Sequence, residues 1–86
     1  PLDEVLAEQL PASTLTPEAA LQARQRVMAL EAALGRLSVE HREILLLRDI
    51  EDLSYDDIAQ VLNISLGTVK SRIARARAGL LQHMPH

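Results

Sequence analysis

The sequence has 86 residues, the length of one small domain, and it contains no cysteine. The missing cysteines exclude a disulfide framework and a thiolate metal site. No apolar run approaches the ~20 residues of a membrane span and no signal peptide is visible, so we expect a soluble, cytoplasmic domain without membrane insertion. Because the sequence begins with Pro1, we expect a fragment of a longer protein.

The aromatic content is very low, with Tyr55 the single aromatic residue, so the core must be built from Leu, Ile, Val and Ala. Leu and Ala favour helices, and the alternation of β-branched residues that is typical of strands is missing. The sequence therefore predicts an all-α fold.

Charge is divided unevenly along the chain, although the formal net charge is only −3. Residues 1–63 carry five Arg against twelve Asp and Glu, whereas residues 64–86 carry four Lys and Arg and no acid. A basic segment on an acidic body is the charge asymmetry that an anionic partner would require. A solvated helix face is the alternative explanation at this point.

The first sixteen residues are predicted to be a linker. Leu2, Val5 and Leu6 are able to form a short apolar stripe, but Pro11 and the polar residues after it break a helix. We therefore favour a partly disordered tail at residues 1–16 and place the domain at residues 17–86.

A first helix is predicted over residues 17–34. Thr16 is its expected N-cap, Pro17 its first residue and Gly35 its left-handed C-terminal stop. Four residues recur at helical spacing and are expected to face the core: Val27, Leu30, Leu34 and Leu37.

A second helix is predicted to begin after Ser38 and to contain the apolar run at residues 44–47. We assign Ile44, Leu45 and Leu47 to the core, and one residue of this run is free to dock a partner, although the sequence does not say which. Residues 48–53 are expected to form a polar connection in which Ile50 and Leu53 are apolar anchors.

A third helix is predicted after Ser54, with Ile58, Val61 and Leu62 on its inner face. Asn63 tolerates the left-handed conformation that ends a helix, and Ile64 then fills the turn. Ser65 is expected to cap a fourth helix over residues 66–81. Helix, tight turn and helix in this order predict a helix-turn-helix at the end of a four-helix domain.

The fourth helix separates into two faces at 100° per residue. Its inner stripe is predicted to contain Val69, Ile73, Ala76 and Leu80. The opposite face carries only small residues, which are Gly67, Ser71, Ala74 and Ala78. Lys70 and Arg75 flank that face, while Arg72 and Arg77 lie nearer the body.

This pattern favours insertion into the major groove of double-stranded DNA. The groove is about 12 Å wide, so short outer side chains let a helix enter while flanking cations reach phosphates or guanine edges. The amide groups at the start of the helix, near Ser65 and Thr68, are expected to face a phosphate. A helix that only confers solubility would not need an outer face of Gly, Ser and Ala.

Three segments resemble bacterial sigma factors: REILLLRD at 42–49, LSYDDIA at 53–59 and GTVKSRIARAR at 67–77. The closest group is the extracytoplasmic-function (ECF) sigma factors, and the match is to their C-terminal region 4. The resemblance covers about residues 25–82, and its most specific part is the arginine spacing of the last segment. It implies a winged-helix-like, three-helical DNA-binding core.

The resemblance also implies partners and residue roles. Such domains bind the −35 promoter element and the β flap of RNA polymerase, and anti-sigma factors often inhibit them. Lys70, Ser71 and Arg75 would face base edges and nearby phosphates. Tyr55, Thr68, Arg72 and Arg77 would be candidates for phosphate contacts. With Ser65, Gly67 and Ala74, these residues form the predicted DNA-binding set.

The rest of the chain is assigned by the same resemblance. The apolar surface of the first two helices would meet the polymerase flap. Residues 1–16 would be the end of the linker from a promoter-melting domain that this sequence lacks. Ala74 replaces a larger side chain found in some relatives, so a groove contact is expected to be missing there.

Two alternatives stay open at this stage. A LuxR-type response-regulator domain also has four helices and a Thr-Val-Lys recognition helix, but it usually continues differently after the lysine. A sigma mimic that binds an anti-sigma factor would keep the fold and lose DNA affinity.

Enzymatic activity is not expected. His41, His83 and His86 lack the paired spacing of metal ligands, so we predict no metal and no cofactor. Asp56 and Asp57 form a carboxylate pair, but their place in the first turn of a helix explains them.

Overall fold

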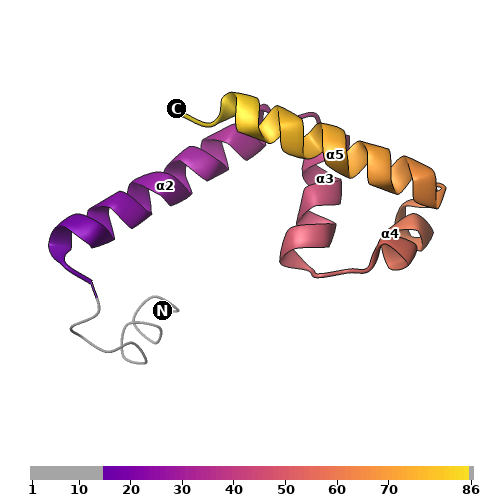
Figure 1. Cartoon of the computed structure of the whole chain (residues 1–86), viewed down its shortest axis with the longest axis horizontal. Coiled ribbons are helices and arrows are strands. Elements are labelled where there is room, and N and C mark those ends of the chain that lie inside the picture. The colour runs from indigo at the N-terminus through magenta and orange to yellow at the C-terminus, as the bar shows by residue number, and fades with distance from the viewer. Residues whose placement is uncertain (1–14, 86) are drawn as a thin grey trace.

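The computed structural model describes residues 15–85, which contain helices and no strand, so the all-α prediction is confirmed. Within these residues, four α-helices and one π-helical turn follow one another (Figure 1). They are α2 (Pro17–Arg36), α3 (Val39–Leu45), η1 (Leu46–Ile50), α4 (Tyr55–Leu62) and α5 (Leu66–His83). The predicted linker lies almost wholly outside the described residues, as does its apolar stripe.

The core lies where α5 crosses α3 and α4. The basic end of the chain forms the long helix α5, which contacts α4, α3 and the last turns of α2 (Figure 1). Every buried side chain in the described part of the chain is apolar. The central cluster consists of Leu37, Ile44, Leu45, Ile58, Val69, Ile73 and Ala76.

The helix α2 begins as predicted but ends differently. The Thr16 hydroxyl accepts a hydrogen bond from the Ala19 N–H at 3.1 Å, and Pro17 is the first helical residue. Gly35 was expected to stop the helix in a left-handed conformation, and this was wrong. The helix continues to Arg36, and none of the glycines in residues 15–85 has a positive φ. Extended backbone at Leu37 makes the turn instead, because Ser38 caps the next helix there.

The predicted core stripe of α2 is correct only near its end. Leu37 is buried and Leu34 packs against the core, but Val27 is 54% and Leu30 40% exposed. In Figure 1 only the last turns of α2 lie beside α5, and the rest of α2 projects beyond the end of that helix. Leu30 lines a surface hollow that it shares with η1 and α5. Ala33, which we did not assign to the core, is buried.

The second helix also begins as predicted, with the Ser38 hydroxyl accepting the His41 N–H at 3.3 Å. Ile44 and Leu45 are buried and Leu47 packs against the core, whereas Leu46 is 40% exposed. Leu46 is therefore the residue of the apolar run that faces outward.

The polar connection predicted at residues 48–53 is partly helical. The π-helical turn η1 continues α3 to Ile50, and the helix ends where Asp52 takes a positive φ of 57°. Asp tolerates this conformation better than most residues, so the helix ends here without a glycine. Leu53 packs against the core as expected, but Ile50 is 72% exposed and is not an anchor.

None of the helices within residues 15–85 has the length and hydropathy needed to cross a bilayer. In the same range, no three His, Asp or Glu side chains gather as ligands for a metal ion.

Gly35 lies within α2, one residue before its end, and this position gives a test of the fold. A Cβ added at Gly35 would meet no atom within 4 Å, and the residue is helical and exposed. Gly35→Ala should therefore stabilise the domain by about 0.5–1 kcal/mol, because alanine loses less backbone entropy in a helix. Urea unfolding measures the change. A loss of stability would instead indicate the left-handed stop.

Candidate nucleic-acid interface

The turn between α4 and α5 depends on Asn63. Its φ of 55° and ψ of 49° are left-handed, as predicted. The Asn63 N–H donates to the Gln60 carbonyl at 3.3 Å, and the Ile64 N–H donates to the Ala59 carbonyl at 3.0 Å. These two bonds form a Schellman motif, in which the residue after the left-handed one packs inward. Ile64 does pack against the core, so the turn has a fixed direction.

The first helix of the motif is held by a cap and an apolar face. The Ser54 hydroxyl accepts a hydrogen bond from the Asp57 N–H at 3.1 Å. Ile58 is fully buried and Leu62 packs beside it, but Val61 is 61% exposed, so its assignment to the inner face was wrong. The inner face follows the spacing i, i+3, i+4, i+7, which includes Tyr55 and Ala59 and turns Val61 outward.

The second helix, α5, is capped by Ser65 as predicted. The Ser65 hydroxyl accepts the Thr68 N–H at 3.1 Å, and the two hydroxyl oxygens lie 2.8 Å apart. The inner stripe is also confirmed: Val69, Ile73 and Ala76 are buried, and Leu80 packs against the core. These contacts fix the rotation of α5 about its axis.

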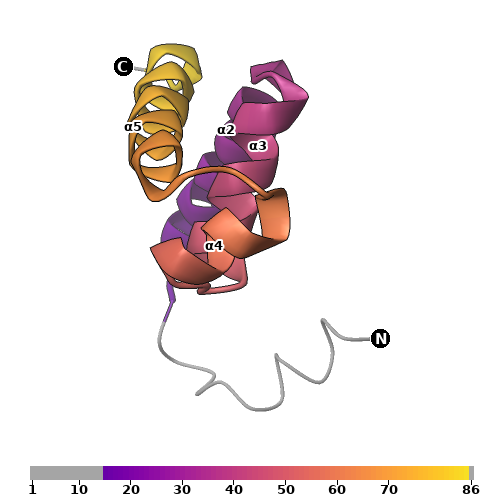
Figure 2. The ribbon, with the colours of Figure 1, turned by 90° about the vertical axis from the view of Figure 1, so that its right-hand side faces the viewer.

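The opposite face of α5 is free. Figures 1 and 2 both place α5 at an edge of the molecule, with one long side that no other helix covers. A Cβ on Gly67 would meet nothing within 4 Å. All the residues predicted for this face are exposed: Gly67, Lys70, Ser71, Ala74, Arg75 and Ala78.

Polar side chains on this face form a short hydrogen-bonded series. The Ser71 hydroxyl donates to the Thr68 carbonyl at 3.2 Å, and Arg75 Nη2 donates to Ser71 Oγ at 3.2 Å. The guanidinium of Arg75 is therefore directed back along the helix, toward the end that carries Ser65. Ordering this side chain in advance lowers the entropic cost of any contact it makes.

The remaining predicted site residues lie at the margins of this face. Arg72 and Tyr55 are partly buried. Arg77 is exposed and forms an ion pair with Asp49 of η1, with 3.0 Å between Nη2 and Oδ1. Tyr55 belongs to α4, so it is the one predicted site residue outside the turn and α5.

Arg48 is a residue that the sequence analysis missed. Its Nη1 donates to the Leu53 carbonyl at 2.8 Å, and its guanidinium carbon lies 5.1 Å from the centroid of the Tyr55 ring. One side chain thus joins η1 to the beginning of α4 and orients Tyr55. A cation over an aromatic ring contributes about 0.5–1 kcal/mol at such a site. The sequence did offer one indication of this contact, because Tyr55 is its single aromatic residue and follows Arg48 closely in the chain.

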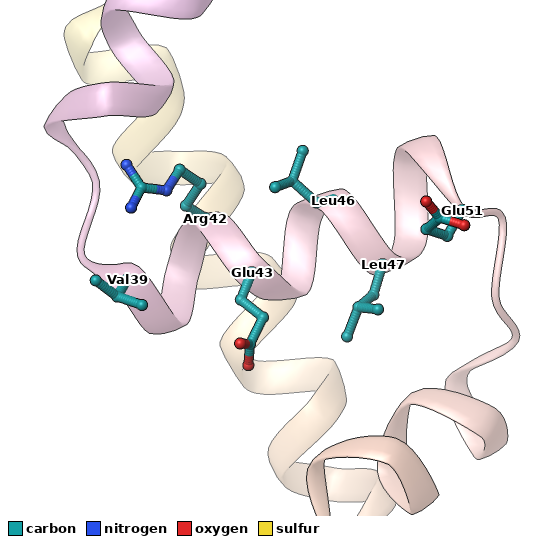
Figure 3. Close-up of a pocket in the computed structure, with 6 residues that line it drawn as sticks. All are labelled: Val39, Arg42, Glu43, Leu46, Leu47 and Glu51. Atoms are coloured by element: carbon teal, nitrogen blue, oxygen red, sulfur yellow. The ribbon is translucent and has the colours of Figure 1, made fainter.

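A second feature is a pair of surface hollows beside α3 and η1. The first runs along the outside of these elements, where Leu46 and Leu47 project from the helix on different sides (Figure 3). It is lined by Val39, Arg42, Glu43, Leu46, Leu47 and Glu51. The second lies between α2, η1 and α5 and is almost wholly apolar. Leu46 borders both hollows.

Two surfaces with different chemistry therefore belong to one core. One is a basic helix face with short side chains, suited to an anionic double helix. The other is an apolar surface on α2, α3 and η1, suited to a protein. A family model described as Sigma-70, region 4 matches residues 27–80, which include both surfaces.

The chain belongs to the sigma-70 region 4 family. The resemblance to ECF sigma factors is confirmed by curated relatives. This region 4 domain is 39% identical over 77 residues to the ECF RNA polymerase sigma factor SigE of Mycolicibacterium smegmatis, covering 90% of this chain and 30% of the relative.

Two further relatives with similar sequences are also sigma factors. Over 56 residues, 45% are identical to ECF RNA polymerase sigma factor SigM of Mycobacterium tuberculosis, covering 65% of this chain and 29% of the relative. Over 83 residues, 36% are identical to RNA polymerase sigma-E factor of Streptomyces coelicolor, covering 96% and 46%. The chain spans less than half the length of each of these relatives.

The turn of this region 4 domain can be tested at Asn63. Asn63→Ala should cost about 1–2 kcal/mol, because a Cβ without a compensating polar group is strained in the left-handed region. Asn63→Gly should keep nearly the wild-type stability, since glycine adopts this conformation without strain. Thermal unfolding of the three proteins measures the difference. Equal stability of the alanine and glycine variants would contradict the turn geometry.

Proposed function

We propose that this chain is the promoter-binding domain of an ECF sigma factor, acting without catalysis in the bacterial cytoplasm. It would bind the −35 element as double-stranded DNA with α5 and dock on the RNA polymerase core with α2, α3 and η1. The carrying observation is the free face of α5, where exposed small residues are flanked by exposed cations. In the proposed longer protein, residues 1–16 belong to the linker and residues 17–86 to this domain.

The proposed roles follow the position of each side chain on α5. Lys70, Ser71 and Arg75 are exposed on the free face, where they would meet base edges. Thr68, Arg72 and Arg77 lie to the sides, where phosphates of the two strands would pass. Tyr55 joins these from α4, while Ser65, Gly67 and Ala74 allow close approach of the helix.

The domain should bind DNA weakly in the absence of polymerase. Few cations contact the duplex and the body is acidic, so the dependence of log K on log salt should have a slope of about −3 to −4. Docking on the polymerase would raise the effective concentration of the domain at the promoter.

Fluorescence anisotropy is the test of the proposed function. Labelled duplexes with a GGAAC-type upstream element and with a scrambled sequence are titrated at low salt, with and without a fragment of the β subunit that carries the flap. Preference for the specific duplex is the expected result. Binding to the flap fragment or an anti-sigma factor without binding to either duplex would favour a sigma mimic.

Arg75 gives the sharpest variant for this assay. Arg75→Ala should cost about 1–3 kcal/mol of binding to the specific duplex and reduce the preference over the scrambled one. Arg26→Ala removes an exposed arginine on α2 and serves as the matched control. An equal loss on both duplexes would instead make Arg75 a phosphate contact.

Polymerase docking is proposed for the apolar surface of α2, α3 and η1. Val39, Leu46 and Ile50 are 67%, 40% and 72% exposed, and they border the two hollows. Leu30 and Leu34 of α2 line the second hollow as well. Apolar side chains around a concave surface provide a site for apolar side chains of a partner helix. An anti-sigma factor that covers this surface would block docking, which we propose as the route of inhibition.

Leu46 tests this surface. Leu46→Ser should weaken binding of the flap fragment about tenfold or more, because it removes an apolar side chain shared by both hollows. Binding of the −35 duplex should not change. The control is Leu81→Ser, which alters a leucine of α5 that is 68% exposed. Calorimetry measures both affinities, and unchanged flap binding by Leu46→Ser would place the docking surface elsewhere.

A further inference from the structure

One ion pair joins the two proposed binding surfaces. Arg77 of α5 and Asp49 of η1 are 28 positions apart in the sequence, and 3.0 Å separates Nη2 from Oδ1. On the α5 side, Arg77 borders the free face. On the other side, Asp49 lines the apolar hollow between α2, η1 and α5.

Asp49 is the charged residue among those that line this hollow. The other lining residues are Leu30, Leu34, Leu45, Leu46, Ile50 and Leu80. A partner that fills the hollow with apolar side chains therefore meets a carboxylate at its edge, where a Lys or Arg of that partner would pair with it. Such a contact would compete directly with Arg77.

The pair is suited to exchange because it is weak. The side chains of Arg77 and Asp49 are 48% and 49% exposed, so water and salt screen their attraction. A pair of this kind contributes little to the stability of the fold. It nevertheless keeps a cation of the recognition helix next to a carboxylate, and that carboxylate would repel a DNA phosphate approaching Arg77.

We propose that Asp49 is a positioning residue that restrains Arg77 and couples the hollow to the DNA-binding face. In the free protein, Asp49 holds Arg77 against η1. When a cation of the docked β flap pairs with Asp49, Arg77 is released to a phosphate, so docking strengthens DNA binding. This inference rests on the proposed function and adds a mode of regulation to it.

The first test is a double-mutant cycle on DNA binding. The proteins are wild type, Asp49→Asn, Arg77→Gln and the double variant, each titrated with the −35 duplex at several salt concentrations. Asp49→Asn should bind about two- to fivefold more tightly, with a salt slope steeper by up to about 0.9. Arg77→Gln should bind more weakly, and adding Asp49→Asn to it should tighten binding less than Asp49→Asn does in wild type, because only the repulsion of phosphate by the carboxylate is left to remove.

A matched control separates the restraint on Arg77 from the general effect of removing one negative charge. Asp52→Asn removes one negative charge from the same connection, at a residue whose left-handed backbone asparagine also tolerates. It should change DNA binding by less than Asp49→Asn. Circular dichroism checks that each variant keeps its helices. This is expected because Asp49, Asp52 and Arg77 are all exposed.

The second test measures coupling between the surfaces with the β-flap fragment. Saturating flap fragment should tighten DNA binding by wild type, and the duplex should tighten flap binding by the same factor, as linkage requires. Asp49→Asn and Arg77→Gln should both lose this coupling, because Arg77 is already free in one and absent in the other.

The outcomes separate this inference from the proposed function. If wild type shows no preference for the −35 duplex, the proposed function itself fails. If wild type shows that preference, this inference is overturned by any of three results. They are a gain from Asp49→Asn that is equally large without Arg77, unchanged DNA binding by Arg77→Gln, and coupling that persists in Asp49→Asn.

Discussion

The packing of α5 onto the rest of the domain is the contact on which both proposed surfaces depend. Val69, Ile73 and Ala76 are buried against a core that includes Ile44 and Ile58. That contact holds one side of α5 inward and therefore leaves the small, basic side facing out. It also holds α3 in place, so η1, which continues α3, presents Leu46 outward. One apolar core thus orients a DNA-facing surface and a protein-facing surface together.

Few polar interactions support this arrangement, and each acts locally. Serine and threonine caps begin the helices, and Asn63 and Asp52 end two of them in the left-handed conformation. Since the core of the described residues is wholly apolar, direction must come from these ends. Arg48 adds one longer link by joining η1 to Leu53 and Tyr55. These local hydrogen bonds fix the turns of a small domain that has no disulfide. They do so without burying polar groups, whose burial would cost free energy.

The exposed apolar residues have a common explanation in the proposed assembly. Val27 and Met28 are 54% and 60% exposed on α2, and most of that helix extends past the end of α5. Leu46 and Ile50 are exposed on η1, the π-helical turn whose Leu47 packs against the core. A domain that works as part of a larger complex can leave such surfaces for its partners, whereas an isolated monomer rarely exposes large contiguous patches. The Asp49–Arg77 pair lies between these surfaces and the recognition helix.

Local chemistry determined much of this protein. The caps at Thr16, Ser54 and Ser65, the left-handed Asn63 and the two faces of α5 follow from side chains that act within one turn of helix. Tertiary structure alone decided the rest. Whether Val27, Val61 or Ile50 is buried depends on which helix lies opposite, and helical spacing does not contain that information. The pairing of Asp49 with Arg77 joins residues 28 positions apart, so it exists only because the packing of α5 on α3 brings Arg77 beside η1.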